Sequence, residues 1–244
     1  MELDYRILIY IFFGVLPSLT WLSYYLTKDM HPEPKRMILK IFLWGALITI
    51  PVFFVQIGCT YLLSLAKIDP LLISIIYWFL VISLTEELFK YFVVKMKVMN
   101  SPHLDEPLDI MLYIVVAALG FAALENVLYL FSPIENLPLN DLISRTMIIA
   151  LVRFVGATFL HTLCSAVVGY ALAISCCDKK NRFLEFISGL IIATFLHGLY
   201  DFSIMTLRGY AQIAIPVITI LVLAIMVFTG FEKLKKIKSV TILN

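Results

Sequence analysis

Charged side chains are scarce in this 244-residue sequence: Asp, Glu, Lys and Arg make up 15% of it, whereas 61% is hydrophobic. Soluble domains carry roughly 25% charged and about 45–50% apolar residues, so an ordinary soluble domain is excluded. The net charge is only +2, which excludes the basic surface that nucleic-acid binding requires. The composition therefore indicates an integral membrane protein that is embedded in a lipid bilayer and binds no nucleic acid.

Several familiar motifs are also missing. The four cysteines lack any CxxC spacing, which argues against a disulfide framework or a zinc knuckle. No HExxH motif of a zinc hydrolase is present, and no rhomboid-like GxSG serine. Tyr200 and Asp201 form a YD pair, but no GxGD follows in the next apolar run, so the presenilin-like aspartyl mechanism is excluded.

What the sequence does contain is a series of apolar runs separated by short polar segments, several of which contain proline. A membrane-spanning helix needs about 20 apolar residues, and these runs are long enough. We expect an all-α polytopic membrane helix bundle that forms a single transmembrane domain over residues 1–244. The seven predicted spans are residues 7–27, 40–66, 71–94, 109–131, 143–177, 183–206 and 211–231.

Basic residues near the span ends predict the orientation, because Lys and Arg in short loops are retained on the cytoplasmic side. If successive spans alternate in direction, four basic residues share the side of the N-terminus: Arg6, Lys67, Arg145 and Arg208. The opposite side holds thirteen: Lys28, Lys35, Arg36, Lys40, Lys95, Lys97, Lys179, Lys180, Arg182, Lys233, Lys235, Lys236 and Lys238. This asymmetry predicts an N-terminus outside and a C-terminus in the cytoplasm.

Ionisable residues inside the spans are the candidate functional residues, because each is expensive to hold in the membrane. They occur only in four consecutive spans, within residues 71–206, so we expect one shared interior site formed by these helices. The eight residues are Glu86, Glu87, Lys90, Glu125, Arg153, His161, His197 and Asp201.

Helical spacing relates several of these residues to one another. Lys90 follows Glu87 by three residues and Glu86 by four, so it can neutralise one of the two carboxylates. Adjacent helical residues diverge by about 100°. We therefore expect one glutamate to face the reacting centre and the other to be held by Lys90 or by a neighbouring helix. His197 and Asp201 are four residues apart, a spacing at which a carboxylate can orient a histidine.

The charges of this set do not balance. Four carboxylates stand against Lys90 and Arg153, which leaves an excess of about two negative charges when the histidines are neutral. Either carboxylates or histidines carry additional protons, or a divalent cation occupies the site. Two simpler interpretations stay open: Lys90 can snorkel toward the cytoplasm, and Arg153 can serve only as an interhelical counter-ion.

The residue types suit hydrolysis by a glutamate-activated water, and they also suit a catalytic zinc ion with an open position. A proton- or cation-coupled transporter is an alternative, since Glu, His and Asp also form ion relays, although no inverted repeat is evident. A seven-span metal-dependent lipid amidase is a second alternative with similar ligands.

Four segments, in this order, resemble the motifs of the PrsW family of intramembrane proteases, which is distantly similar to the CAAX-type membrane endopeptidases. They are Glu86-Glu87-x-x-Lys90 followed by Tyr91, GFAALEN ending at Asn126, His161 in a helix ending in Gly169-Tyr170, and HGLYDF beginning at His197. Glu125 replaces the second-motif histidine of the CAAX-type enzymes, and Lys90 stands one position before their expected arginine. These departures favour the PrsW branch.

The resemblance implies a multi-pass protease in the cell membrane of a bacterium or archaeon, which cuts a membrane-anchored protein such as an anti-sigma factor. It implies that Glu86 and Glu87 supply the water-activating base. It also implies that Glu125, His161 and His197 complete the catalytic site and that Lys90, Asn126 and Asp201 support it. Glu125, His161 and His197 are the candidate ligands of a metal, expected to be zinc. CAAX-type relatives resemble metal-free glutamate proteases, so both mechanisms are expected alternatives.

Overall fold

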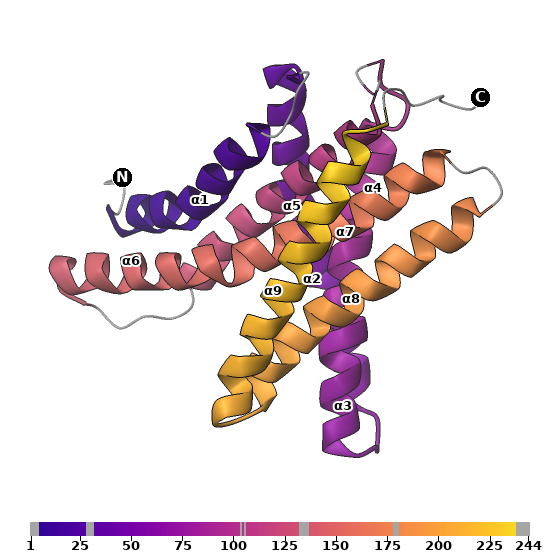
Figure 1. Ribbon diagram of the computed structural model, residues 1–244. Helices are drawn as coiled ribbons and strands as arrows, with labels where there is room; N and C mark the ends of the chain where they lie inside the picture. The colour runs from indigo at the N-terminus through magenta and orange to yellow at the C-terminus, as the bar shows by residue number, and fades with distance from the viewer. Residues whose placement is uncertain are drawn as a thin grey trace.

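The fold is entirely helical over the residues that the computed structural model describes, namely 5–27, 32–102, 104, 106–131, 137–177 and 181–237 (Figure 1). The elements are α1 (Tyr5–Leu26), α2 (Lys35–Ser64), α3 (Pro70–Ile76), the π-helix η1 (Tyr77–Leu84), α4 (Thr85–Lys97), α5 (Pro107–Leu130), α6 (Leu139–Val155), α7 (Ala157–Cys177), α8 (Arg182–Thr206) and α9 (Tyr210–Leu234).

Within the described residues, seven helical stretches are long and apolar enough to cross a membrane, which confirms the predicted polytopic bundle. Two stretches combine several elements: α3, η1 and α4 run together over Pro70–Lys97, and α6 and α7 together cover Leu139–Cys176. All seven agree with the predicted spans to within a few residues. The orientation stays a prediction, and four of its lysines lie outside the described residues: Lys28, Lys179, Lys180 and Lys238.

Helix α5 lies at the centre of the bundle, where α1, α2 and α7 pack around it (Figure 1). Its most apolar stretch is 94% buried, against 22–39% in the other spans. Small residues allow the close approach of α2: a Cβ added at Gly120 would collide with the carbonyl oxygen of Phe42, and one added at Gly45 would collide with that of Ala117. The α2–α5 contact therefore depends on glycine at both positions.

The span predicted over residues 143–177 is interrupted at Gly156, which separates α6 from α7. Gly156 has φ −91° and ψ −100°, outside the helical region. A Cβ added there would lie 2.5 Å from the hydroxyl oxygen of Tyr200 on α8. Glycine thus allows α8 to approach the chain at the joint, a feature that the apolar pattern of the span did not predict.

Replacement of Gly120 by alanine tests this packing. Gly120→Ala should lower the stability by about 1–3 kcal/mol, because the added methyl group overpacks the contact with α2. Gly58→Ala in α2 is the matched control, since nothing lies within 4 Å of a Cβ added there. The measurement is thermal unfolding of the purified proteins in detergent. Equal midpoints for the two variants would contradict the close α2–α5 contact.

Candidate active site

The helix that carries the first two glutamates is preceded by a π-helix, η1, whose turns contain more residues than those of an α-helix. Ser83 Oγ donates to the carbonyl oxygen of Trp78, five residues earlier, at 2.6 Å. The wider winding changes the direction in which the following side chains point, and α4 begins one residue before Glu86. The apolar run of η1 predicts an ordinary helix here, because nothing in the run indicates π winding.

Both carboxylate oxygens of Glu87 are occupied by partners from its own helix and from two others. Oε1 accepts from Lys90 Nζ at 2.8 Å and contacts His197 Nδ1 on α8 at 3.0 Å. Oε2 accepts from Ser165 Oγ on α7 at 2.7 Å. Of the two adjacent glutamates, Glu87 is thus the one that Lys90 and the neighbouring helices hold.

Glu86 has one carboxylate oxygen that is bound and one that is not. Oε1 accepts from Gln56 Nε2 on α2 at 3.2 Å. Oε2 is buried and has no hydrogen-bond partner among the described residues. The nearest polar groups are Lys90 Nζ at 3.6 Å, His161 Nδ1 at 3.7 Å and His197 Nε2 at 3.8 Å. A buried carboxylate oxygen without a partner requires an explanation, and this one faces two imidazoles.

Lys90 is completely buried, so the snorkelling interpretation is wrong. Its ammonium group lies 2.9 Å from His161 Nδ1 and 4.6 Å from the centre of the Phe121 ring. An ammonium group can only donate, so Nδ1 of His161 is the acceptor. The proton of this imidazole is therefore on Nε2, which lies 2.8 Å from Glu125 Oε2 and donates to it.

Glu125 lies at the edge of the cluster and forms an ion pair with α6. Arg153 Nη2 lies 2.9 Å from Glu125 Oε2, and Arg153 Nε donates to Asn126 Oδ1. The amide nitrogen of Asn126 donates to Gly14 O at 3.2 Å and to Thr158 Oγ1 at 3.0 Å. Arg153 therefore acts as an interhelical counter-ion, and Asn126 fixes its position.

His197 faces carboxylates on both sides of its ring. Nε2 lies 3.3 Å from Asp201 Oδ2, as the spacing of four residues predicts, and 3.8 Å from Glu86 Oε2. Nδ1 is directed at Glu87. Two carboxylate oxygens facing one ring nitrogen attract it only when a proton or another cation lies between them.

The contacts also locate the excess negative charge. Glu87 is paired with Lys90, and Glu125 is paired with Arg153. The two remaining carboxylates belong to Glu86 and Asp201, and both face His197 Nε2. The charge of about −2 that the composition of the spans predicts is therefore concentrated at one point of the cluster.

All the predicted site residues lie in one connected network, and the structure adds two that sequence reasoning missed. Gln56 supports Glu86 from α2, and Ser165 supports Glu87 from α7. Gln56 could have been found, because an amide inside an apolar span is rare and is usually functional. Ser165 carried no such signal, since small hydroxyl residues are common in membrane helices.

The donor groups fit a metal ion. Glu86, His161 and His197 each offer one ligand atom, and these atoms lie within 4.8 Å of one another. Ligands that share a tetrahedral zinc ion lie roughly 3.3–3.6 Å apart, so the distances of 3.7 and 3.8 Å from Glu86 Oε2 are close to suitable. The family resemblance implies Glu125 as the third ligand, but the group of close donor atoms contains Glu86 in that position, and Glu125 contacts the outer nitrogen of His161.

A cavity of about 280 Å³ opens next to this cluster, between α5, α6 and α8. Arg153 and Asp201 line it, together with apolar side chains that include Val152, Ile204 and Met205. Glu125, whose side chain is 34% exposed, is far more accessible than Glu86 at 6%. The site therefore has a buried centre and an accessible edge.

Carboxylates and imidazoles that surround one unpaired oxygen inside a bundle of membrane-spanning helices are the groups that a membrane-embedded hydrolase requires. The chain belongs to the PrsW family of intramembrane metalloproteases, whose family model matches residues 33–230. This range includes the whole cluster, and the assignment confirms the resemblance of the four motifs.

Three relatives illustrate the assignment. Protease PrsW of Oceanobacillus iheyensis is 30% identical over 235 residues, which cover 95% of this chain and 97% of that protein. Protease PrsW of Geobacillus kaustophilus is 31% identical over 195 residues, or 79% of this chain and 78% of that protein. Protease PrsW of Bacillus subtilis is 28% identical over 237 residues, or 95% and 96%. No solved structure matches the chain.

The family assignment decides between the functional alternatives. The protein is a multi-pass membrane protease that acts on protein, rather than a transporter or a lipid amidase. The description of the family as metalloproteases agrees with the Glu86, His161 and His197 donor set.

The buried ion pair can be tested by a double-mutant cycle. Lys90→Met should lower the stability by about 3–5 kcal/mol, because it leaves Glu87 buried without its cation. Adding Glu87→Gln should restore part of this loss, since the uncompensated charge is then removed. Lys95→Met, an exposed position on the same helix, is the control. Unfolding in detergent is the measurement, and similar stabilities of the two single lysine variants would argue against the buried pair.

Proposed function

We propose that the protein hydrolyses peptide bonds of membrane-anchored proteins in the cell membrane and that Glu86 is the base that activates the attacking water. The single transmembrane domain would carry this site on the helices within residues 71–206. The observation that carries the proposal is Glu86 Oε2, a buried oxygen without a hydrogen-bond partner among the described residues, which faces His161 and His197. A water molecule that donates to this oxygen would lie next to both imidazoles.

In the proposed reaction, Glu86 takes a proton from water while the water oxygen adds to the carbonyl carbon of the peptide bond. Lys90 lies 3.6 Å from Glu86 Oε2 and supplies positive charge near the oxyanion that develops. Glu86 then passes its proton to the amine nitrogen as the carbon–nitrogen bond breaks. Glu87 acts as a positioning residue, because both of its oxygens hold other members of the site.

The orientation of the two histidines supports zinc as the metal. Each imidazole directs one nitrogen toward Glu86 Oε2 and the other toward a carboxylate: His161 contacts Glu125, and His197 contacts Glu87. This matches the pattern in which a carboxylate orients a metal-bound histidine. In a metal-dependent form of the reaction, Glu86, His161 and His197 would be the ligands, and a divalent ion held there would polarise the peptide carbonyl and activate water in place of Glu86.

The position of Lys90 bears directly on whether His161 can bind a metal ion. His161 Nδ1 has one lone pair, and Lys90 Nζ already lies 2.9 Å from it. The ammonium group and a metal ion therefore compete for the same nitrogen. The two uncompensated charges of Glu86 and Asp201 favour the divalent ion, whereas the contact with Lys90 favours a metal-free glutamate mechanism.

The substrate that we propose is a membrane-anchored protein such as an anti-sigma factor, as the resemblance of the four motifs implies. The cavity between α5, α6 and α8 supports this class of substrate. It joins a mostly apolar lining, suited to a chain that arrives from the lipid, with Arg153 and Asp201 at the cluster. Both charged groups could hold the polar backbone of an extended segment.

Glu86→Gln tests the proposed base. Cleavage of a co-expressed membrane-anchored reporter should fall by about 10²–10⁴, because the amide cannot accept the proton of water. Glu232→Gln, the same change at an exposed carboxylate, should leave cleavage unchanged. Immunoblotting would verify that both variants accumulate. Normal cleavage by Glu86→Gln would end the proposal that this residue is the base.

Elemental analysis tests the metal separately. The purified protein should contain about one zinc ion per chain, and His161→Ala and His197→Ala should lose it. Glu125→Gln should weaken binding by only about 10–100-fold, because Glu125 would orient a ligand without binding the ion. An active, chelator-resistant protein without zinc would reject the metal and leave Glu86 as the base of a metal-free mechanism.

A further inference from the structure

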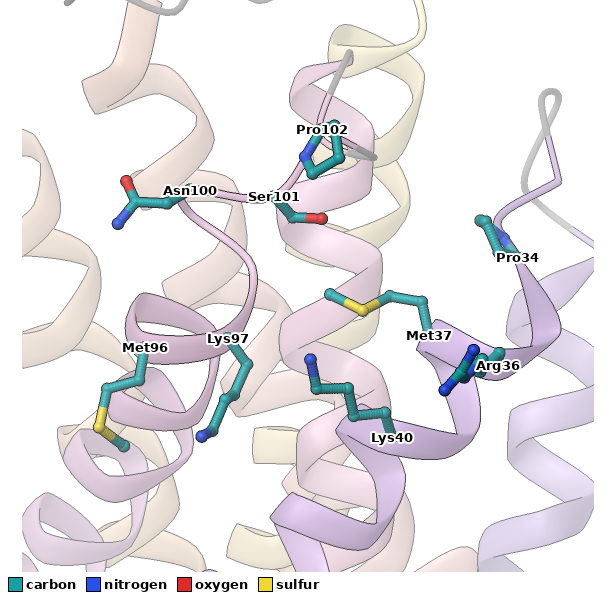
Figure 2. A pocket seen from close by; sticks show the side chains of 9 residues that line it. All are labelled: Pro34, Arg36, Met37, Lys40, Met96, Lys97, Asn100, Ser101 and Pro102. Carbon is teal, nitrogen blue, oxygen red and sulfur yellow. The ribbon is translucent and has the colours of Figure 1, made fainter.

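A second cavity, of about 610 Å³, lies between the start of α2 and the end of α4, and none of the residues of the acid–histidine cluster lines it. Arg36 and Lys40 contribute to it from α2, and Lys97 contributes from α4. Figure 2 shows the side chains of Lys40 and Lys97 extending into the space between the two helices, with Asn100 and Ser101 on the segment that follows α4. The lining is therefore rich in groups that bind an anion.

Ion pairs to these three cations are absent among the residues that the structure describes. None of the carboxylates in the described parts of the chain forms an ion pair with Arg36, Lys40 or Lys97. Lys97 Nζ instead lies 3.9 Å from the centre of the Trp44 ring, which holds the ammonium group at the wall of the cavity. Like charges gathered around one space repel one another, so an anion bound there would lower the electrostatic energy.

The surroundings of the cavity indicate the kind of anion. A stripe of exposed leucines, Leu39, Leu43 and Leu47, begins beside Lys40 and follows one side of α2 at intervals of four residues. These side chains are 58%, 51% and 52% exposed, as expected for a surface covered by lipid. Met96, 60% exposed, continues the apolar surface on α4 at the cavity itself. A ligand with a charged head and apolar tails would cover both surfaces.

We propose that this cavity binds the phosphate headgroup of an anionic phospholipid whose acyl chains lie along the exposed leucine stripe of α2. Basic pockets between membrane helices on the cytoplasmic side are suited to such headgroups, and the distribution of Lys and Arg predicts that this end of the bundle is cytoplasmic. The phosphate would lie among Arg36, Lys40 and Lys97. A free phosphate ion would use the same three cations but would leave the leucine stripe uncovered.

The experiment measures lipid binding by the purified full-length protein in a zwitterionic detergent. Phosphatidylglycerol should raise the thermal midpoint in a saturable manner, whereas phosphatidylcholine should not. In the variant R36Q/K40Q/K97Q, the affinity for phosphatidylglycerol should fall by about tenfold or more, since each basic residue near an anionic lipid contributes substantially. The measured quantities, the thermal midpoint and the lipid affinity, do not depend on protease activity. The lipid proposal therefore succeeds or fails separately from the proposed function.

A matched variant controls for overall charge. K233Q/K235Q/K236Q also removes three positive charges, at the end of α9, which Figure 1 shows at the same end of the bundle. It should retain the affinity of the unmodified protein. If both triple variants lose affinity equally, attraction is diffuse and the cavity is not a site. If inorganic phosphate raises the midpoint as much as the lipid does, the lipid proposal is overturned.

One further variant guards against misfolding. R36Q/K40Q changes only two exposed residues, so it should retain the helical content of the unmodified protein by circular dichroism. It should still bind phosphatidylglycerol less tightly than K233Q/K236Q, which removes two charges elsewhere. Equal affinities of these two folded variants would also reject the site.

Discussion

The contact between Lys90 and Glu87 governs the rest of the site, because both groups are removed from water completely. A buried ion pair recovers its desolvation cost only when the remaining donors and acceptors are satisfied. Glu87 meets this requirement by also engaging Ser165 and His197, and Lys90 does so by engaging His161. One ion pair thereby determines the relative positions of α4, α7 and α8 and leaves the neighbouring Glu86 as the group with an unused oxygen.

The two histidines continue the network of polar contacts beyond the Lys90–Glu87 pair. Each one is anchored on its outer side by a carboxylate, and each presents the opposite nitrogen to Glu86. At His161, the Lys90 ammonium group and Glu125 together place the proton on Nε2 before any substrate arrives. Preorganisation of this kind is what hydrolysis inside a membrane requires, because few water molecules are present to reorient around a developing charge.

Much of this site could be predicted from the sequence, because ionisable residues are rare enough in apolar spans to stand out one by one. Helical spacing also predicted the approach of His197 to Asp201 and the neutralisation of one glutamate by Lys90. The choice between Glu86 and Glu87 could not be predicted. It depends on the π-helical winding of η1 and on a serine from another helix. Neither feature can be recognised from the amino-acid composition or from the hydrophobic periodicity of the sequence.

The fold, like the site, could be predicted only in part from the sequence. Seven apolar runs predicted seven spans, but an apolar pattern reports only that a segment is buried or faces lipid, and it says little about where a helix bends. The interruption at Gly156 is one result, since a glycine within an apolar run is compatible with a continuous helix. The close packing of α5 against α2 is another, because it depends on a glycine whose role the apolar pattern does not reveal.

The interruption at Gly156 has a consequence for the electrostatics of the site. Arg153, the counter-ion of Glu125, lies on the last turn of α6, three residues before the joint. The helical hydrogen-bond ladder is not continuous between this arginine and His161 on α7. Trp21 on α1 spans the joint, because its ring stacks on Phe154 of α6 and on Phe159 of α7. The charge balance at the accessible rim therefore depends on α1, which holds the two helical segments together.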